Sequence, residues 1–470
     1  MMADLDVLLL SRLQFAFTVS FHIIFPSFTI GLASYLAVLE GMWLWTRDDV
    51  YKNLYLFWVK IFAIAFGMGV VSGVVMSYQF GTNWSVFSDK TGSVLGPLLA
   101  FEVLTAFFLE ASFLGIMLFG WKRVGPRLHF VATLFVAGGT LLSAFWILAA
   151  NSWMQTPAGF EEKDGLFIAT SFWDVIFNPS TPSRFLHMAI AAYLTTAFVV
   201  LGSAGLLSLF RRQSRELNTM RRMAILLIVF AAPLQLVVGH ESGRVAHEYQ
   251  PAKVAAMEGW WETRAGQPSI LFAIPDAENE RNHMEVGVPG LGSWVVAGDS
   301  TATLKGLKDF APEDRPPVAI VFWSFRVMVG LGMLMILMGV VGVGLWWLGW
   351  LDRFKLFHVA AVLMGPSGFI AVLAGWISAE VGRQPYVVYG VLRTADAISP
   401  VTAEQVSLSL LFFMVVYAIV FSTGVLYILR LIWKGPDKDE AAVEGGVRAP
   451  GNALSALFTG PRTVESRHGN

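Results

Sequence analysis

The segment AIVFWSFRVMVGLGMLMILMGVVGVGLWWLGW, residues 319–350, contains a single charged side chain, that of Arg326. A helix needs about 20 mostly apolar residues to cross the hydrocarbon core of a bilayer, which is about 30 Å thick. Backbone amides inside lipid must also be bonded within the segment, so an apolar run of this length predicts a transmembrane helix. We therefore expect an integral membrane protein.

Apolar runs of similar length recur along most of the chain. The 470 residues are 55% hydrophobic and 14% charged, whereas soluble domains usually contain about 25% charged residues. Breaks rich in charge, proline or glycine separate nine candidate helices, at about 13–45, 54–77, 95–120, 127–150, 185–210, 220–239, 319–350, 358–379 and 407–433. The sequence thus predicts an all-α membrane domain over 1–435, followed by a disordered cytoplasmic tail over 436–470.

Basic residues are concentrated in alternate loops of this arrangement. Arg47 and Lys52 follow the first span, and the third, fifth and seventh loops carry further lysines and arginines. Short basic loops remain in the cytoplasm. The sequence therefore predicts an outer N-terminus and a cytoplasmic C-terminus. By the same parity, one long loop at about 240–317 lies outside.

The absence of cysteine from the sequence limits the possible cofactors. It excludes disulfides, thiolate-held zinc, thiolate-held iron–sulfur clusters and covalently attached c-type haem. Any metal must therefore be held by histidine, methionine or carboxylate side chains. The first residues, MMADLDVLLLSR, have neither a basic segment nor a small-residue cleavage site, so we expect no removable signal peptide.

A few polar or metal-ligating side chains fall inside the predicted spans, where such groups are costly and often functional. They are His22 in the first span, Glu102 and Glu110 in the third, His187 in the fifth, Arg326 and Met328 in the seventh, and Glu380 at the end of the eighth. In the predicted orientation His22, Glu102, His187, Met328 and Glu380 lie in the outer half of the membrane. Along a straight α-helix, Glu110 would lie about 12 Å deeper than Glu102 and about 80° away around the axis. It could begin a path toward the cytoplasm.

Each of these residues also has a less specific interpretation. A single membrane histidine such as His187 is more often a packing residue than a metal ligand, and a methionine in an apolar helix usually fills the core. Glu380 can pair with Arg383 at a helix end. His129 and His358 lie at cytoplasmic span starts and are interpreted as interfacial. Histidines, a methionine and glutamates at one depth nevertheless favour haem, because His with Met is a common axial pair for a low-spin haem.

Longer motifs carry a family resemblance. They are SRLQFAFTVSFHIIF (11–25), YQFGTNWSVFS (78–88), GPLLAFEVLTAFFLEASFLG (96–115), LSAFWILAANSWMQ (142–155), GHESG (239–243) and GWISAEVGRQPY (375–386). These segments resemble subunit I of the cytochrome bd family of quinol oxidases, to about residue 435. The long loop lacks the insertion of the family's long-loop branch, and Tyr386 stands where many members carry tryptophan. The chain thus resembles the short-loop branch, which includes the cyanide-insensitive oxidases.

The resemblance implies three haems and their iron ligands. His187 in SRFLHMA and Met328 in FWSFRVMVG would ligate a low-spin b haem, with Arg326 close to its propionates. His22 and Glu380 would be axial ligands of two high-spin haems, in an order that the sequence does not assign. The expected cofactors are two b-type haems and one haem d, with a third b-type haem as the alternative.

Further residues would surround these haems. Glu102 would lie beside the high-spin pair, Glu110 on the proton route, and Trp376 among the haems as an aid to electron transfer. Arg383 and Gln384 would hold the carboxylate ligand at the end of the eighth span or a haem propionate.

The segment QPAKVAAMEGWW (250–261) resembles the family's quinol-binding segment. Lys253 would hydrogen-bond a quinol oxygen, and Glu258 would accept one of the protons that quinol oxidation releases. From the residues alone, a solvated face of an amphipathic helix is the alternative.

The resemblance implies a quinol:oxygen oxidoreductase of the bacterial cytoplasmic membrane. Ubiquinol or menaquinol would be oxidised at the outer face, and oxygen reduced to water with cytoplasmic protons, which generates a proton motive force without pumping. A subunit II in a heterodimer, and small single-span subunits, would be the protein partners; no nucleic acid is expected. Two alternatives are a proton-coupled transporter that uses Glu102, Glu110 and Glu380, and a haem protein without turnover. Haem content and quinol-driven oxygen consumption distinguish the three.

Overall fold

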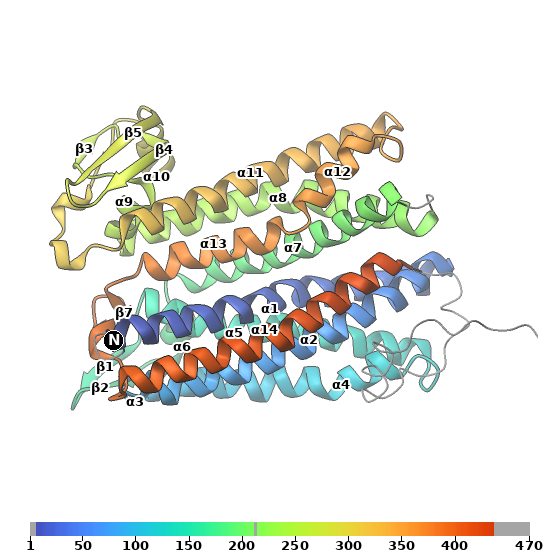
Figure 1. Cartoon of the computed structure of the whole chain (residues 1–470), viewed down its shortest axis with the longest axis horizontal. Coiled ribbons are helices and arrows are strands. Elements are labelled where there is room, and N and C mark those ends of the chain that lie inside the picture. The colour runs from blue at the N-terminus through green and yellow to red at the C-terminus, as the bar shows by residue number, and fades with distance from the viewer. Residues whose placement is uncertain (1–5, 211–213, 437–470) are drawn as a thin grey trace, which may run out of the picture.

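The computed structural model describes residues 6–210 and 214–436 (Figure 1). Within these ranges nine helical segments are long and apolar enough to cross a membrane, which confirms the predicted all-α membrane fold. They are Val7–Thr46, Asp49–Thr82, Ser85–Phe119, Pro126–Gln155, Phe172–Phe210, Arg215–Tyr249, Pro312–Trp347, Lys355–Val381 and Ala403–Lys434. The predicted tail lies outside the described residues from 437 onward.

Most spans contain one long helix. These helices are α1 (Val7–Thr46), α2 (Asp49–Thr82), α5 (Pro126–Gln155), α7 (Thr181–Phe210, preceded by the short α6, Phe172–Ile176), α8 (Arg215–Tyr249), α11 (Val318–Trp347) and α14 (Ala403–Lys434). Two spans are divided. The third consists of α3 (Ser85–Phe101), the π-helical turn η1 (Glu102–Phe107) and α4 (Phe108–Phe119), and the eighth of α12 (Lys355–Met364) and α13 (Ser367–Val381).

Several helices are longer than the apolar runs that predict them, because polar caps extend them beyond the lipid. Asp6 accepts a hydrogen bond from the backbone N–H of Leu8 at 2.9 Å, so α1 begins well before residue 13. Thr402 and Gln405 form a capping box at the start of α14. Such caps satisfy backbone donors that the first helical turn leaves free. Hydropathy detects the apolar part of a helix and misses these polar ends.

The predicted long loop is folded and lies at one end of the bundle (Figure 1). It contains α9 (Pro251–Glu258), α10 (Leu291–Ala297), the hairpin of β4 (Ser269–Asp276) and β5 (Arg281–Val288), the pair of β3 (Arg264–Ala265) and β6 (Thr303–Leu304), and the 3₁₀ turns η2 (Leu307–Asp309) and η3 (Pro312–Asp314). Trp260 and Trp261 form its small core with the start of α11. Two further hairpins lie elsewhere in the chain. One pairs β1 (Phe160–Lys163) with β2 (Leu166–Ala169), and the other pairs β7 (Tyr386–Val388) with β8 (Leu392–Arg393). The 3₁₀ turn η4 (Thr394–Asp396) follows the second hairpin.

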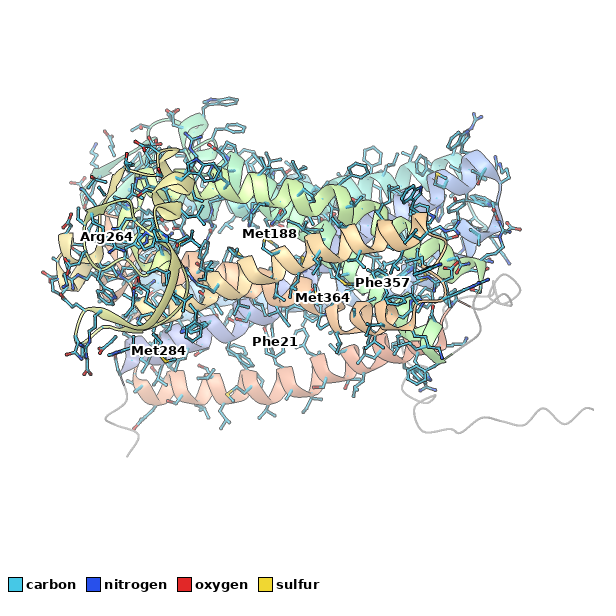
Figure 2. The ribbon with its side chains drawn as sticks, turned by 90° about the horizontal axis from the view of Figure 1, so that it is seen from above. Phe21, Met188, Arg264, Met284, Phe357 and Met364 are labelled. Carbon is cyan, nitrogen blue, oxygen red and sulfur yellow. The ribbon has the colours of Figure 1, made fainter. Side chains whose placement is uncertain are left out.

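The ends of the chain agree with an odd number of spans. The start of α1 lies at the same end of the bundle as the long loop, and α14 ends at the opposite end (Figure 1). Seen from above, Arg264 and Met284 of the loop lie at one end, and Phe357 of α12 lies toward the other (Figure 2). We call the end with the loop the outer end and the opposite end the inner end.

Helices α1 and α7 form the centre of the bundle. A Cβ atom at Gly31 of α1 would lie 2.5 Å from the Thr196 hydroxyl of α7, so only glycine permits this close approach. Thr196 donates a hydrogen bond to the Phe28 carbonyl at 2.8 Å. Helices α11 and α14 are far less buried. The ligand-type side chains of α1 and α7 therefore lie within the protein interior.

Candidate functional site

Glu380, in the last turn of α13, is surrounded by polar side chains from neighbouring helices. Its Oε1 accepts hydrogen bonds from Asn151 and Gln155 of α5, each at 3.1 Å. Its Oε2 lies 2.5 Å from Nη2 of Arg383. Nη2 of Arg184, from α7, lies 4.0 Å from Oε1. The carboxylate is therefore held in one position by partners on α5 and α7 and in the turn that follows α13.

Cations outnumber carboxylates in this cluster. Lys253 of α9 is buried and donates to Oε1 of Gln155 at 2.5 Å, so Arg184, Arg383 and Lys253 all surround Glu380. Burial, with the two arginines nearby, holds the pKa of Lys253 well below its usual range. Two buried nitrogens of Arg383, Nε and Nη1, have no hydrogen-bond partner among the described residues. Because buried charges are normally paired, this surplus favours an anionic ligand.

His187 and Met328, the predicted low-spin ligands, both lie against glycines of adjacent helices. A Cβ atom at Gly239 of α8 would lie 3.1 Å from Cε1 of His187, and one at Gly375 of α13 would lie 2.8 Å from Sδ of Met328. His187 Nε2 lies 3.2 Å from Nε2 of Gln235. Its buried Nδ1 has no partner in the described part of the chain. A histidine with an unsatisfied nitrogen is compatible with a metal ligand. Trp376, which follows Gly375, is half-buried in α13.

His22 lies near the middle of α1 and faces α2. Its Nδ1 is 2.9 Å from the Ser72 hydroxyl, and a Cβ atom at Gly73 would lie 3.2 Å from its Cε1. One turn earlier on the same face, Thr18 donates to Oε1 of Gln79 at 2.8 Å. The face of α1 that carries Thr18 and His22 therefore lies against α2, whereas the Glu380 cluster lies among α5, α7 and α13.

Glu102 and Glu110 face the same helix, and the expected 80° offset between them is wrong. Glu102 accepts a hydrogen bond from Ser143 of α5 at 2.8 Å. The Cγ of Glu110 lies against Gly139, where a Cβ atom would approach it to 2.7 Å. The π-helical turn Glu102–Phe107 contains one extra residue. The eight-residue step from Glu102 to Glu110 therefore turns through about the same angle as seven residues of an α-helix, which is close to two full turns. The two side chains thus lie on the same side of the helix.

Glu258, at the end of α9, forms an ion pair with Arg326 of α11, and the Oε2–Nη2 distance is 3.1 Å. Arg326 also donates from Nε to the Ile270 carbonyl at 2.9 Å and from Nη1 to the Met257 carbonyl. Arg326 thereby ties α9 and β4 to the membrane bundle. Burial raises the pKa of Glu258, and Arg326 opposes that shift. Since Lys253 is only 4% exposed, α9 is not a solvated charged face.

The sequence reasoning overlooked three polar residues of the Glu380 cluster. Gln384, expected beside that carboxylate, instead accepts a hydrogen bond from Thr394 at 2.8 Å, and Gln155 occupies the expected position. Asn151 and Gln155 are part of the motif LSAFWILAANSWMQ, and Arg184 is part of SRFLHMA. The signal was present in motifs that already carried the resemblance, but these residues had been given no role.

The interfacial interpretation of His129 and His358 is wrong. Each is only 2% exposed. His129 lies in the first turn of α5, where it faces the interior, and its Nδ1 is 2.6 Å from Oε1 of Glu40 on α1. A position near a helix end does not specify whether the side chain faces water or a neighbouring helix.

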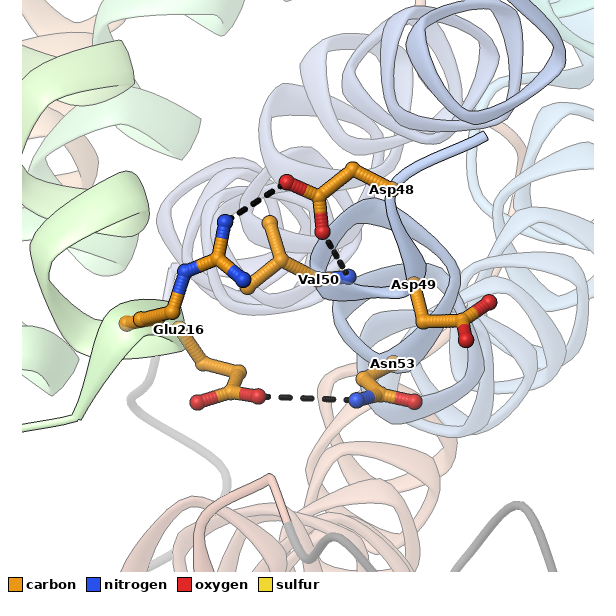
Figure 3. Close-up of a pocket in the computed structure, with 6 residues that line it drawn as sticks. Asp48, Asp49, Val50, Asn53 and Glu216 are labelled. Atoms are coloured by element: carbon orange, nitrogen blue, oxygen red, sulfur yellow. Dashed lines mark hydrogen bonds and ion pairs between the residues drawn. The ribbon is translucent and has the colours of Figure 1, made fainter. Parts of the chain in front are cut away.

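A surface pocket of about 170 Å³ lies at the inner end, between the starts of α2 and α8 (Figure 3). It is lined by Asp48, Asp49, Val50, Asn53, Arg215 and Glu216. Arg215 donates to Asp48 at 2.7 Å, and Asn53 donates to Glu216 at 3.4 Å. These groups cap and connect helix ends, and the lining has no histidine or methionine, so we do not assign a haem site here.

The sequence profile of the cytochrome bd terminal oxidase subunit I family matches residues 10–436 of this chain. The chain belongs to this family. The resemblance read from the motifs is thereby confirmed. Membership makes the chain a terminal oxidase subunit, and with its apolar helices a multi-pass protein of the bacterial cytoplasmic membrane.

Individual relatives match over nearly their full length. The chain is 36% identical over 452 residues to cytochrome bd ubiquinol oxidase subunit 1 of Bacillus subtilis (strain 168), which covers 92% of this chain and 95% of the relative. It is 32% identical over 502 residues to cytochrome bd-II ubiquinol oxidase subunit 1 of Escherichia coli (strain K12). That alignment covers 92% of this chain and 97% of the relative. The solved bd oxidase of Geobacillus thermodenitrificans matches with a TM-score of 0.85 and 30% identity, over 92% of this chain and 100% of that chain.

Haem is the cofactor type that the bd family implies, and the residues of this chain fit it. His187 has a buried nitrogen without a partner in the described residues, and Arg383 has two. An imidazole with an unpaired nitrogen can ligate haem iron, and a guanidinium with unpaired nitrogens can bind a haem propionate.

Proposed function

We propose that this chain is the haem-carrying subunit of a quinol:oxygen oxidoreductase. Its Bacillus subtilis and Escherichia coli relatives are named as ubiquinol oxidases. One observation carries the proposal most directly: Gln155 accepts a hydrogen bond from Lys253 and donates one to Glu380. A single amide thus connects the proposed quinol segment with a proposed haem ligand.

Lys253 and Glu258 form the proposed quinol site at the outer end. Quinol oxidation releases two protons, and the Glu258 carboxylate can accept one while Lys253 hydrogen-bonds a quinol oxygen. Because burial raises the pKa of Glu258, its carboxylate is a stronger base than an exposed glutamate. Arg326 fixes that carboxylate at 3.1 Å.

The haem-binding residues are proposed from the donor types. His187 and Met328 would ligate a low-spin b haem, and His22 and Glu380 would ligate two high-spin haems, of which one is haem d or a third b haem. Bound haem supplies electron transfer and, at a position left open on iron, oxygen reduction. Arg383 would bind a propionate through the nitrogens that have no other partner among the described residues. Trp376, one residue after Gly375, would lie among the haems.

Glu110 and Glu102 are proposed to bring protons from the inner end, which the basic loops identify as cytoplasmic. Protons used for water would come from the cytoplasm, and protons from quinol would leave at the outer face. This separates charge across the membrane without a pump.

The proposed assembly contains a subunit II as a heterodimer partner, with small single-span subunits as further candidates. The substrate is a membrane quinol, either ubiquinol or menaquinol.

Reduced-minus-oxidised absorption spectra of the purified complex test this function, together with pyridine haemochrome analysis, carbon monoxide addition and quinol-driven oxygen consumption. We expect b-type bands, a carbon monoxide response and oxygen uptake. A red chlorin band would identify haem d, whereas b bands alone would identify an all-b enzyme. A complex without haem would contradict the proposal in favour of a transporter, and haem without oxygen uptake would favour a sensor or electron carrier.

A further inference from the structure

A buried acid–base pair lies near the inner end of the bundle, away from the proposed quinol and haem residues. Glu40 of α1 is 0% exposed and His129 of α5 is 2% exposed, and Oε1 of the carboxylate is 2.6 Å from Nδ1 of the imidazole. Oε2 of Glu40 accepts a hydrogen bond from Thr133 at 2.6 Å. The Tyr55 hydroxyl lies 3.1 Å from that of Thr133. His129 Nε2 is buried and has no partner in the described chain.

Two aromatic side chains pack against the His129 ring of this pair. The ring centroids of Trp121 and His129 are 4.8 Å apart, and those of Tyr55 and His129 are 5.8 Å apart. Trp121 lies in the short loop between α4 and α5 and is half-buried. The Lys52 ammonium lies 5.8 Å from its ring centroid. The pair is therefore shielded from water but lies close to it.

The pair contacts the same helix as the carboxylates of the proposed proton route. His129, Thr133, Gly139 and Ser143 occur along α5 at intervals of four to six residues, and His129, Thr133 and Ser143 lie within an arc of about 80° around that helix. Gly139 contacts Glu110, and Ser143 is hydrogen-bonded to Glu102. From Thr133 to Gly139 the helix rises about 9 Å and turns by about 240° beyond one full turn, so the proposed route includes a chain of hydrogen-bonded waters between Glu40 and Glu110.

We infer that Glu40 and His129 form the inner entrance of the route that supplies protons to Glu110; this rests on the proposed oxidase function. His129 accepts a proton from water at Nε2 and releases its Nδ1 proton to the Glu40 carboxylate. Glu40 then passes that proton toward Glu110, and rotation of the imidazole restores the first tautomer. One proton moves from the inner end toward Glu110 in each cycle, and both residues return to their starting protonation states.

Two conservative variants of the purified oxidase complex test this route. His129→Asn keeps a donor near Nδ1 but cannot relay a proton, and Glu40→Gln keeps the shape of the carboxylate. We expect quinol-driven oxygen consumption per haem to fall about 100-fold in each, since a positioned acid or base contributes about 10²–10⁴-fold. The solvent deuterium isotope effect should rise above the wild-type value, and Glu40→Asp should recover part of the rate.

His358→Asn is the matched control, because His358 is equally buried but lies on α12, away from α5. It should retain at least about half of the wild-type rate, as expected for a residue without an acid–base role. Wild-type rates in both His129→Asn and Glu40→Gln would overturn the inference, and so would slower rates with an unchanged isotope effect. If His129→Asn loses haem, the oxygen consumption and isotope effect of Glu40→Gln decide whether the inference holds. Failure of the wild-type complex to oxidise quinol would instead overturn the proposed function.

Discussion

The outer cluster around Glu380 and the inner column along α5 use similar residue types in opposite proportions. In the outer cluster Arg184, Arg383 and Lys253 surround one carboxylate, and part of Arg383 has no partner among the described residues. A buried excess of positive charge is costly unless an anion is bound. The outer region is therefore suited to holding a charged cofactor.

In the inner column carboxylates predominate and are separated along one helix. Glu40, Glu110 and Glu102 each contact α5, at Thr133, Gly139 and Ser143 respectively. These groups are spaced too far apart to hold one ligand together, but their spacing suits stepwise proton transfer. The balance and spacing of buried charges therefore differ between the proposed cofactor site and the proposed proton route.

We expect the largest effect on haem content and oxidase activity when Glu380 of the outer cluster is replaced. Glu380→Ala removes a proposed iron ligand and leaves Arg383 and Arg184 without their shared anion. We expect the high-spin haem signal to disappear and oxidase activity to fall by more than about 100-fold, since even residues that only support a metal ligand contribute about 10–100-fold. Haemochrome analysis and oxygen consumption measure both effects. Normal spectra and turnover in this variant would contradict the assignment.

Glu258 tests whether the outer region also contains a base. Glu258→Gln should lower kcat/KM for quinol about 100-fold. Because burial raises the pKa of Glu258, the wild-type rate should decline as the pH falls through that pKa and the carboxylate becomes protonated. The rate of the Glu258→Gln variant should not show this decline at acidic pH. Glu262→Gln, at a side chain that is 66% exposed in the same loop, should keep the wild-type profile; an unchanged profile in Glu258→Gln would exclude this base.

Arg383 tests the requirement for an anion with a smaller expected effect. Arg383→Gln should reduce haem content or raise haem loss about tenfold, as for other residues that support a metal site. Arg393→Gln is the control, because Arg393 forms a half-exposed ion pair with Asp314, and such pairs contribute about 0–1 kcal/mol. Equal haem retention in the two variants would mean that the buried guanidinium does not bind a propionate.

Gly139 provides the mildest change to the inner column. Gly139→Ala places a Cβ atom 2.7 Å from Cγ of Glu110, so the glutamate must shift. We expect turnover to fall about threefold with haem retained, since a small displacement of a proton-transfer group weakens its contribution. At the adjacent Gly138 a Cβ atom meets nothing within 4 Å, so Gly138→Ala should turn over normally. Equal turnover in Gly139→Ala and Gly138→Ala would mean that Glu110 is not part of the proton route.

Hydropathy predicted the nine spans because the length and polarity of a segment are local properties. It missed the polar ends of helices such as α1, where Asp6 provides a cap. It also could not detect the π-helical turn at Glu102–Phe107, which depends on packing against α5. That turn is the reason why Glu102 and Glu110 face the same helix.

The candidate site was predicted only in its residue types. The motif containing Glu380 and Arg383 indicated an anionic ligand beside a cation, and their ion pair is present in the structure. The participation of Gln155 could not be predicted, because it requires the end of α5 to meet α9 and α13. His129 was misassigned for the same reason, since its partner Glu40 lies 89 positions away.

The sequence by itself determined that this protein spans a membrane many times, has no thiol chemistry and carries histidine, methionine and carboxylate side chains inside its spans. Those properties follow from composition, run length and motifs. Only the tertiary structure decided which buried charges share an environment, because distant helix faces meet through packing. That packing places Arg184, Arg383 and Lys253 around Glu380, and it places Glu40, Glu102 and Glu110 along α5.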